Sequence, residues 1–598
     1  MNTAVNERET ESGADRSGVT PDASVNSILR EPEFWLLHHL PLRSTIPVIL
    51  FAALAAWVVL ALDAPLAAAT GVGAGALLLG LAPVRTRNPR NVVGILAEWL
   101  AFRWRRVRPG QVAAGAEAFD VPLPEGGSYG MRWDGGLLIT MLRIDPPPDA
   151  LTLLRRGSLS TDQTIPLDEI ARCLEQFDIN LTSIDVISTG ARTAGATPIA
   201  DLYDRIIGPL PAIAQRTVWL VLRLEPLANA QAVDNRGGSG SGALRTAIIA
   251  TRRVANRLAA RDISVSVLTA GEMNTAARQL LRGIPLDQFT ETPKSLVHGD
   301  LHLTSYEIGP DLIGERGFSD IWATPSSATT VTVRLRPGTA GTGRGRDTAT
   351  PSIALDALVR FDTLTEPDGP PLPGLRPLSG RQFRALLDCL PTRIGGSDIG
   401  RTGDHRGLRS ALMGIAVPTA GCGQLIGADD HGQGIAVPLI GDGTRRLAVV
   451  GRLDLAQQVI LRSIALGAHV VVHTDRPDAW HTMVSNVDTP QVLSLVSRFS
   501  GSGHPAPAAT QAGAPIPPTS VVVFDGIAPT ALTGGATIVQ VRPPEESTDR
   551  LDADVILIQD PAAPNIITVR TSAVTTTVNM VTTPEEMRYI GESLTAVR

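Results

Sequence analysis

IPVILFAALAAWVVLALDAPLAAATGVGAGALLLGLAPV occupies residues 46–84 and contains one charged residue, Asp63. Two uncharged apolar runs, residues 46–62 and 65–84, lie on either side of the short link that contains this aspartate. A bilayer core about 30 Å thick is crossed by roughly 17–25 apolar helical residues. The pattern therefore predicts a transmembrane hairpin of two helices joined by a tight turn.

Arginines follow this hairpin, and Trp99 lies among them at helical spacing with other apolar residues. Because lysine and arginine are enriched on the cytoplasmic side of membrane spans, we expect a multi-pass plasma-membrane protein whose N-terminus and later domains are cytoplasmic. Residues 85–117 are expected to form a helix on the membrane surface or, alternatively, on the protein's own domain. The topology and membrane-surface residues are Arg85, Arg87, Arg90, Trp99, Arg103, Arg105, Arg106 and Arg108.

Small residues recur every four positions in the second apolar run, at Ala67, Gly71 and Gly75. Small side chains at this spacing let two helices approach closely. The sequence thus predicts a helix-packing face, for which the first helix of the hairpin is the nearest partner. The alternative is that glycine is merely common in helices of this kind.

Composition excludes several classes of protein. The net charge of the 598 residues is −6, so the chain has no basic surplus for binding nucleic acid. Lys294 is the one lysine and follows no glycine-rich loop, which excludes a P-loop ATPase. Cys173, Cys389 and Cys422 are far apart and lack the spacing of metal ligands.

Composition shifts divide the chain into consecutive segments. Residues 1–27 are polar and predict a disordered tail, and residues 337–378 are rich in Gly, Thr and Pro. The predicted segments are a tail (1–27), a pre-membrane segment (28–45), the hairpin (46–84), an arginine-rich helix (85–117), a first cytosolic α/β domain (118–336), a linker or insertion (337–378) and a second cytosolic α/β domain (379–598).

Both cytosolic domains show strand-like runs alternating with amphipathic helices. In the first, residues 180–189 and 216–225 are strand-like and enclose the helical run 199–210. Such alternation favours an α/β domain with a largely parallel sheet. In the second, residues 446–474 predict a βαβ unit. Its first turn has a single glycine in place of G-x-G-x-x-G, so we expect two degenerate Rossmann-like units without a cofactor site.

Asp552 and Asp554 have the D-x-D spacing that glycosyltransferases use to hold a divalent ion with a nucleotide-sugar. They precede a predicted strand, whereas ligand sites in α/β sheets lie at the carboxyl ends of strands. A solvated loop is therefore the favoured interpretation.

Two histidine groups are candidate sites, the first for zinc and the second for catalysis at the end of a strand. The HGDLH sequence favours a surface turn between strands over a zinc site. VVHTDRPDAWH surrounds the end of a predicted strand but carries no catalytic signature. The residues concerned are His298, Asp300 and His302 in the first group and His473, Asp475 and His481 in the second.

Taken together, the order of these segments resembles the EccE family, membrane components of the type VII (ESX) secretion systems of mycobacteria and related actinobacteria. The resemblance is carried by VRTRNPRNVVGILAEWLAFRWRR (84–106), FDVPLPEGGSYGMRWDGGLLITMLRI (119–144), RPLSGRQFRALLDCLP (376–391), and HGQGIAVPLIGDG (431–443) leading into LAVVGRLDLAQQVILRSIALGAHVVVHTDRPDAW (447–480).

This resemblance implies a non-catalytic structural subunit at the edge of an inner-membrane complex, with no cofactor and no catalytic residues. It also implies EccB, EccC and EccD as partners, in addition to the lipid bilayer, with EccC as the ATPase. The alternative function is a membrane-tethered enzyme, glycosyltransferase-like or nucleotide-binding, that uses Asp552 and Asp554.

Overall fold

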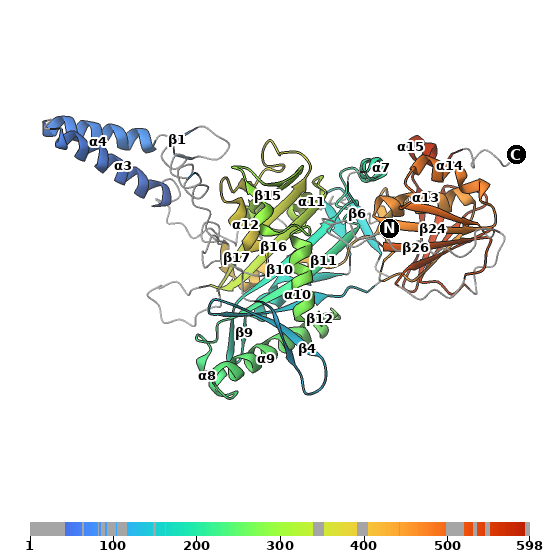
Figure 1. The fold of residues 1–598 in the computed structure, drawn as a ribbon, viewed down its shortest axis with the longest axis horizontal. Helices are drawn as coiled ribbons and strands as arrows, with labels where there is room; N and C mark the ends of the chain where they lie inside the picture. Colours follow the sequence, from blue (N-terminus) through green and yellow to red (C-terminus); the bar gives the residue numbers. More distant parts are fainter. Residues whose placement is uncertain are drawn as a thin grey trace, which may run out of the picture.

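The computed structural model shows two sheet-based units preceded by a pair of helices (Figure 1). It describes residues 42–62, 65–81, 83–84, 90–91, 103, 117–147, 151–161, 163–195, 197–338, 352–391, 405–441, 443–497, 519–529, 535–544 and 551–591.

The apolar stretch forms two helices, α3 (Leu42–Ala61) and α4 (Leu66–Leu81), which lie side by side (Figure 1). Ala69 of α4 is buried in this contact. A Cβ added to Gly73 would lie 3.2 Å from the Cβ of Ala56 on α3. Small side chains therefore set the spacing between the two helices, as in other closely packed helix pairs.

The predicted membrane-spanning hairpin is wrong, because no helix of the described residues is long and apolar enough to cross a membrane. Helix α4 has 16 residues, or about 24 Å at 1.5 Å per residue, against a bilayer core of about 30 Å. Helix α3 begins with Leu-Arg-Ser-Thr, so its uncharged apolar part is no longer than α4. The multi-pass topology inferred from the hairpin is therefore unsupported.

The segment after the hairpin contains a short antiparallel pair in its described part, β1 (Pro83–Val84) with β2 (Arg90–Asn91). Arg90 therefore belongs to a strand, whereas the sequence predicted a helix over residues 85–117. The rest of the predicted arginine-rich helix lies largely outside the described residues.

The first unit is built on a 14-stranded sheet in which every pairing is antiparallel. Its main path, in spatial order, is β13 (Thr290–Glu291), β14 (Leu296–His298), β15 (Leu301–Ile308), β17 (Ser352–Thr363), β16 (Ala328–Pro337), β10 (Ile179–Ala191), β11 (Gln215–Leu224), β5 (Leu137–Ile144), β4 (Ser128–Asp134) and β3 (Phe119–Pro122). Short strands β9 (Glu175–Gln176), β12 (Val265–Val267), β18 (Leu375–Pro377) and β19 (His405–Leu408) pair beside this path.

The prediction of a largely parallel first sheet is wrong, although its strands form where expected. Strands β10 and β11 are antiparallel neighbours despite the helix between them, α7 (Pro198–Ile207). A parallel pair needs its connecting helix to cross back over the sheet. Here α7 instead packs on a helix of the second unit, so the chain returns beside β10 in the reverse direction.

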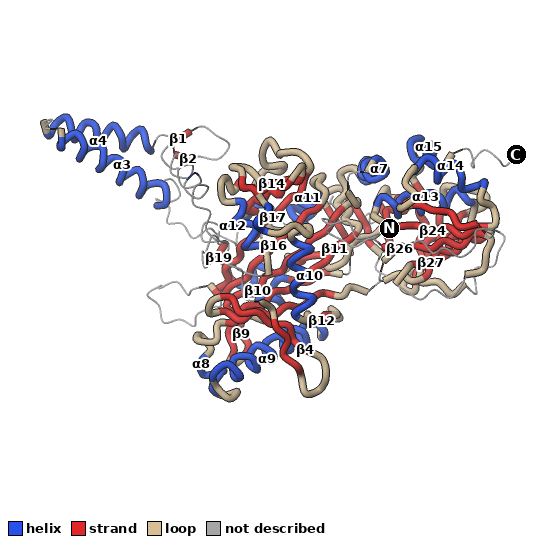
Figure 2. The backbone as a smooth tube through the Cα atoms, in the orientation of Figure 1, coloured by secondary structure: helices blue, strands red, loops and turns tan. Residues whose placement is uncertain are grey.

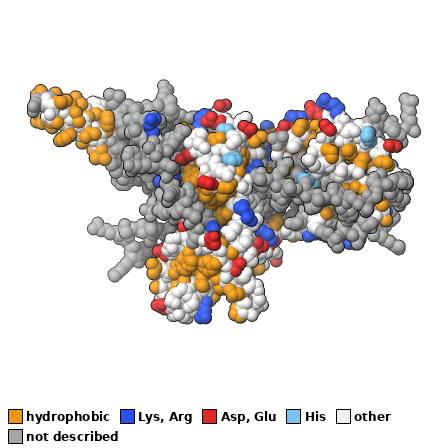
Figure 3. Space-filling view, in the orientation of Figure 1, with side chains coloured by type: hydrophobic (Ala, Val, Ile, Leu, Met, Phe, Trp, Pro, Cys, Tyr) orange, Lys and Arg blue, Asp and Glu red, His pale blue; other side chains and the backbone are white. Residues whose placement is uncertain are grey.

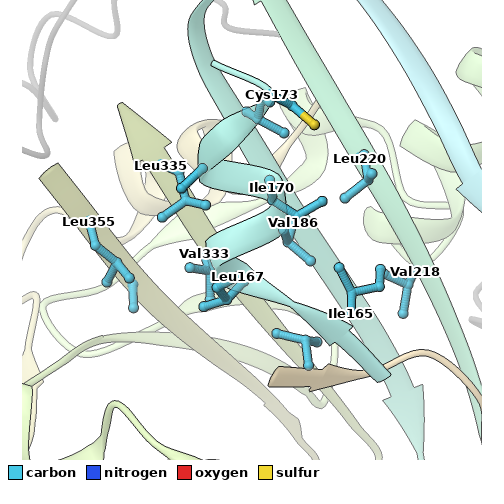
Figure 4. Close-up of a cluster of buried hydrophobic side chains, with 14 of the residues drawn as sticks. Ile165, Leu167, Ile170, Cys173, Val186, Val218, Leu220, Val333, Leu335 and Leu355 are labelled. Atoms are coloured by element: carbon cyan, nitrogen blue, oxygen red, sulfur yellow. The ribbon is translucent and has the colours of Figure 1, made fainter. Parts of the chain in front are cut away.

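The apolar face of this sheet forms the main core of the first unit. Helices α6 (Leu167–Arg172), α9 (Ser239–Ala259) and α11 (Glu315–Ala323) contribute side chains to it. Figure 4 shows part of this cluster between α6 and the strands. The side chains labelled there are Ile165, Leu167, Ile170, Cys173, Val186, Val218, Leu220, Val333, Leu335 and Leu355. Helix α10 (Ala270–Leu280) and the residue after α12 (Gln382–Cys389) pack on apolar side chains of the opposite face.

The second unit has a mixed sheet, parallel at one end and antiparallel at the other. The parallel strands, in spatial order, are β25 (Leu493–Ser497), β24 (Ala468–Thr474), β26 (Thr519–Asp525), β27 (Thr537–Arg542), β23 (Arg446–Val450) and β28 (Val555–Gln559). The sheet continues antiparallel through β29 (Ile566–Thr571), β30 (Thr575–Met580), β21 (Gln424–Ala428), β22 (Gly434–Val437), β6 (Thr152–Arg155) and β7 (Ser158–Ser160). The predicted βαβ unit is present as β23, α13 (Leu453–Ala465) and β24. Figure 2 shows strands β24, β26 and β27 in red, with helices α13, α14 (Asp478–Val487) and α15 (Pro584–Ile590) in blue nearby.

The two units are interlocked, because part of the chain that builds the first sheet completes the second. Strands β6 and β7 extend the second sheet next to β22. Immediately afterwards β8 (Thr164–Pro166) pairs with β20 (Ala416–Pro418). Helix α7 packs on α13, and the hydroxyl of its buried Tyr203 accepts a 2.7 Å hydrogen bond from the backbone N–H of Leu425. The boundary between the units therefore does not follow the order of the sequence.

Buried ion pairs tie the strands and helices together. Asp185 in β10 is fully buried and accepts hydrogen bonds from Arg223 in β11 and Arg334 in β16, the latter at 2.8 Å. In the second unit Arg462 of α13 donates to Glu586 of α15 (Pro584–Ile590) at 2.7 Å. A buried charge is tolerated only where partners of opposite charge or hydrogen bonds replace water.

We expect replacement of Asp185 by alanine to destabilise the protein by about 3–5 kcal/mol, because two buried guanidinium groups lose their shared carboxylate. Urea unfolding of the purified full chain would measure the change. Asp552→Ala is the control, since that side chain is 87% exposed and pairs with a half-exposed arginine. Equal midpoints for both variants would show that the buried network contributes little.

The same carboxylate should make stability depend on pH. Burial alone would raise the pKa of Asp185, but Arg223 and Arg334 outweigh it and lower the pKa from 3.8 to about 2. A depressed folded-state pKa stabilises above the unfolded value and loses that contribution as pH falls through the folded value. The difference in unfolding free energy between wild type and Asp185→Asn should therefore be constant above about pH 4 and shrink towards pH 2.

Candidate functional site

The carboxyl edge of the parallel strands is where ligand sites form in α/β sheets, and in the second unit it is centred on Asp525. This residue ends β26 and is fully buried. Its carboxylate accepts hydrogen bonds from Trp480 Nε1 at 2.8 Å and from Thr474 Oγ1 at 3.0 Å. Arg476 completes the cluster with Nη2 at 2.6 Å and Nε at 2.9 Å from the two carboxylate oxygens.

This cluster is internally satisfied. The guanidinium of Arg476 occupies the side of Asp525 where a bound cation would otherwise lie, and the hydrogen bond between them raises the pKa of Arg476. Indole and hydroxyl donors fill the remaining directions around the carboxylate. The arrangement positions the loop after β24 against β26, which is a structural role.

The first turn of the βαβ unit is also filled, by Gln559 of β28. Its Oε1 accepts the backbone N–H of Arg452, the residue preceding α13, at 2.8 Å. A Cβ added to Gly451 would lie 2.7 Å from the Cβ of Gln559. A phosphate group binds at such a turn through the free N–H groups of the helix start. Here the amide side chain of Gln559 accepts the N–H at the helix start.

The D-x-D pair lies at the opposite, amino-terminal edge of the parallel strands. Asp554 Oδ2 accepts the backbone N–H groups of Arg445 and Arg446 at 2.7 and 2.9 Å, at the start of β23. Asp552 is exposed and pairs with the Arg446 side chain. Both carboxylates thus contact residues at the start of β23. They lie at the amino-terminal edge of the parallel strands, as expected from their position before a predicted strand.

The HGDLH residues form a tight hairpin between β14 and β15, as the favoured interpretation predicted. His298 is paired with Leu301 and His302 with Val297, so the two imidazoles emerge on opposite faces of the ribbon. Within the ranges the structure describes, no group of three His, Cys, Asp or Glu side chains is placed to hold a metal ion.

The second histidine group is dispersed around the carboxyl edge. His473 stacks on Phe524 with ring centroids 5.3 Å apart. His481 and Asp475 are exposed, on α14 (Asp478–Val487) and in the loop before it. These residues surround the Asp525 cluster, which Asp475 contacts through its backbone N–H, 3.4 Å from the carbonyl oxygen of Asp525.

The predicted packing face of the hairpin points away from α3. Ala67 and Gly71 are exposed, and no atom of the described chain lies within 4 Å of a Cβ added to Gly71 or Gly75. The contact with α3 is made instead by the offset pair Ala69 and Gly73. The face formed by Ala67, Gly71 and Gly75 remains a prediction for a partner other than α3.

The membrane-surface residues are described only in part. Arg103 is exposed, and Arg90 lies in β2. The remaining residues of that prediction lie outside the described ranges: Arg85, Arg87, Trp99, Arg105, Arg106 and Arg108.

Comparison with known proteins shows which family the chain is similar to. Residues 212–308, from the segment preceding β11 to the end of β15, match the family model described as "Putative type VII ESX secretion system translocon, EccE". The comparisons support an EccE component of a type VII secretion system. The family resemblance noted in the sequence is thereby confirmed.

Three relatives from mycobacteria carry the same family name. The chain is 26% identical over 406 residues to the ESX-1 secretion system protein EccE1 of Mycolicibacterium smegmatis, covering 67% of this chain and 76% of the relative. It is 26% identical to the ESX-5 protein EccE5 of Mycobacterium marinum, with 54% and 79% covered. It is 25% identical to the ESX-2 protein EccE2 of Mycobacterium tuberculosis, with 63% and 64% covered.

We expect Asp525→Ala to lower the unfolding free energy by roughly 2–4 kcal/mol, because the buried N–H of Trp480 and O–H of Thr474 lose their acceptor, at about 1–3 kcal/mol each. Thermal denaturation followed by tryptophan fluorescence would measure it. The neighbouring exposed Asp475→Ala is the control and should change little. A stability loss no larger than that of the control would contradict the structural role assigned to Asp525.

Proposed function

We propose that this EccE protein is a non-catalytic structural subunit of a type VII (ESX) secretion complex. The observation that carries the proposal is the family match, together with relatives named as proteins of the ESX-1, ESX-2 and ESX-5 secretion systems. By family resemblance the partners are subunits of the EccB, EccC and EccD types, with ATP hydrolysis supplied by EccC.

The geometry of the second unit supports a structural role over the enzymatic alternative. Asp525 is neutralised by Arg476, Gln559 fills the first turn of the βαβ unit, and Asp554 binds two backbone N–H groups. Each group that a nucleotide or its metal ion would need is engaged by another part of the chain.

The interlocked architecture also suits a scaffold. Strands β6 and β7 and helix α7 join the second unit, so relative movement of the units would break sheet hydrogen bonds and the Tyr203–Leu425 bond. A rigid body that presents two sheet units in a constant relation can hold partner subunits at defined positions.

The test is to purify the tagged full chain from its host under mild conditions, size it on a native gel and identify co-migrating chains by mass spectrometry. We expect a particle far larger than 63.0 kDa that contains an ATPase and other subunits of the secretion system. A lone chain, under conditions that keep other complexes intact, would overturn the proposal.

The enzymatic alternative makes an opposite prediction that can be measured on the same preparation. It requires saturable binding of a nucleotide-sugar with Mn²⁺ that is lost in Asp552→Asn. This variant is suitable because the Asp552 side chain is exposed, whereas Asp554 holds backbone groups of β23. We expect no saturable binding to either the wild type or the variant.

We also propose that Ala67, Gly71 and Gly75 form the face on which a helix of another subunit packs. Gly71→Leu should leave the folded chain unchanged, since no described atom lies near its Cβ position, yet release the protein from the complex on the native gel. Gly73→Leu is the contrasting variant, because its side chain would collide with Ala56 and separate α3 from α4. Unchanged co-migration of Gly71→Leu would rule out this face.

A further inference from the structure

Phe177 is a large apolar side chain that the fold leaves almost completely in water. Its exposed fraction is 99%, the highest among the exposed large hydrophobic residues of the described chain. It sits in the two-residue turn between β9 and β10, where Gln176 pairs with Ile179. Exposed apolar residues are common, but one presented whole at the tip of a hairpin contributes nothing to the core.

The backbone at this residue is also unfavourable for phenylalanine. Phe177 has φ +56°, in the left-handed region, while Asp178 does not have a positive φ. A two-residue hairpin turn with a positive φ at its first central position is normally made by glycine there. A residue with a bulky Cβ substituent is strained in this conformation, and such strain occurs often at binding sites.

The surrounding chain holds the turn in one conformation. The carboxylate of Asp178 forms ion pairs with Arg236 at 2.7 Å and Arg253 at 3.4 Å. Arg253 Nη1 also donates to the carbonyl of Gln176 at 3.0 Å, and its guanidinium carbon lies 5.3 Å from the centroid of the Phe177 ring. The ring is therefore preorganised on a rigid turn, which lowers the entropy lost on binding.

A second exposed apolar side chain lies on a loop that is hydrogen-bonded to Asn180, at the start of β10 just after this turn. Leu227 is 84% exposed, in the loop between β11 and α8 (Ala230–Asp234). Two residues further on, the buried Asn229 accepts the N–H of Asn180 at 2.7 Å and donates to its carbonyl at 2.9 Å. Figure 1 shows α8 beside the β9 end of the sheet. We call Phe177 and Leu227, with Arg236 and Arg253, the Phe177 patch.

We propose that the Phe177 patch docks another protein chain of the secretion assembly, one that presents an apolar pocket with carboxylates at its rim. Aromatic and arginine side chains dominate the binding energy of protein interfaces, especially where an aromatic ring fills a pocket. Arg236 is 14% exposed and paired at 2.7 Å with Asp178, which leaves Arg253, 35% exposed, as the accessible positive charge of the patch. An acidic rim is complementary to that charge. A second copy of this chain would bring an equally arginine-bearing patch and not the carboxylates that the patch complements.

This inference rests on the proposed function, which names the secretion assembly as the source of the partner. The tests below can fail while the proposed function stands. The first test places photoreactive benzoylphenylalanine at position 177 of the full chain in its host, with position 364 as control, where the exposed Leu364 lies outside the patch. We expect one discrete cross-linked species from position 177 and none from 364. Mass spectrometry should identify its partner as a subunit of the assembly, and the cross-link should weaken at least tenfold with Arg253→Glu.

Each other outcome overturns the inference. These outcomes are no adduct, equal adducts from both positions, a cross-linked dimer of this chain, or an adduct that does not depend on Arg253. If the wild type co-migrates with the assembly and position 177 gives no adduct, the docking inference fails while the proposed function stands. If the wild type does not co-migrate at all, the proposed function fails, and with it the partner named here.

The second test separates docking from a structural role. Phe177→Asn should leave the thermal midpoint of the purified protein unchanged or raise it, because asparagine tolerates a positive φ. The same variant should reduce recovery of the identified partner at least tenfold, whereas Leu364→Asn should not. A midpoint several degrees lower, or undiminished partner recovery, would show that Phe177 serves the fold and not a partner.

Discussion

The architecture depends on β6 and β7, which the chain of the first unit contributes to the sheet of the second. After β5 the chain leaves the first sheet, contributes β6 and β7 to the far end of the second, and pairs β8 with β20. Helix α7 then crosses to pack on α13 before β11 returns to the first sheet. Because backbone hydrogen bonds join β6 to β22, the second sheet is incomplete without strands from the chain of the first unit.

Local sequence predicted the elements well and their partners poorly. The Val-, Ile- and Thr-rich run of β10 predicted a strand at the right place, as did the apolar runs of β23 and β24. Whether neighbouring strands run parallel depends on where the connecting helix packs, and α7 packs on α13 more than 240 residues later. No local sequence pattern predicts that contact. The antiparallel pairing of the first sheet could therefore not be predicted from the alternation of strand-like and helical runs.

In the candidate site and the hairpin too, local features could be predicted from the sequence, whereas features set by distant residues could not. The position of Asp554 before a strand placed it at the wrong edge for a ligand, and this local argument agrees with the structure. Asp525 was not selected from the sequence, because its partners Arg476 and Trp480 lie 49 and 45 residues away along the chain. An aspartate directly after the apolar run of β26 was nevertheless a usable signal.

For the hairpin, apolar composition predicted two helices. Helix length, however, depends on where each helix ends, and α4 ends at Leu81.

Strands β6 and β7 also constrain the order in which the protein can fold during synthesis. Strands β6 and β7 emerge from the ribosome early, yet β22, the strand that β6 pairs with, follows about 280 residues later along the chain. At synthesis rates of about 5–20 residues per second, that delay lasts roughly 14–60 seconds. Until then two short strands have unpaired edges, which are sites for incorrect pairing. Pairings between strands so distant in sequence also fold slowly, because a long loop must close before any contact forms.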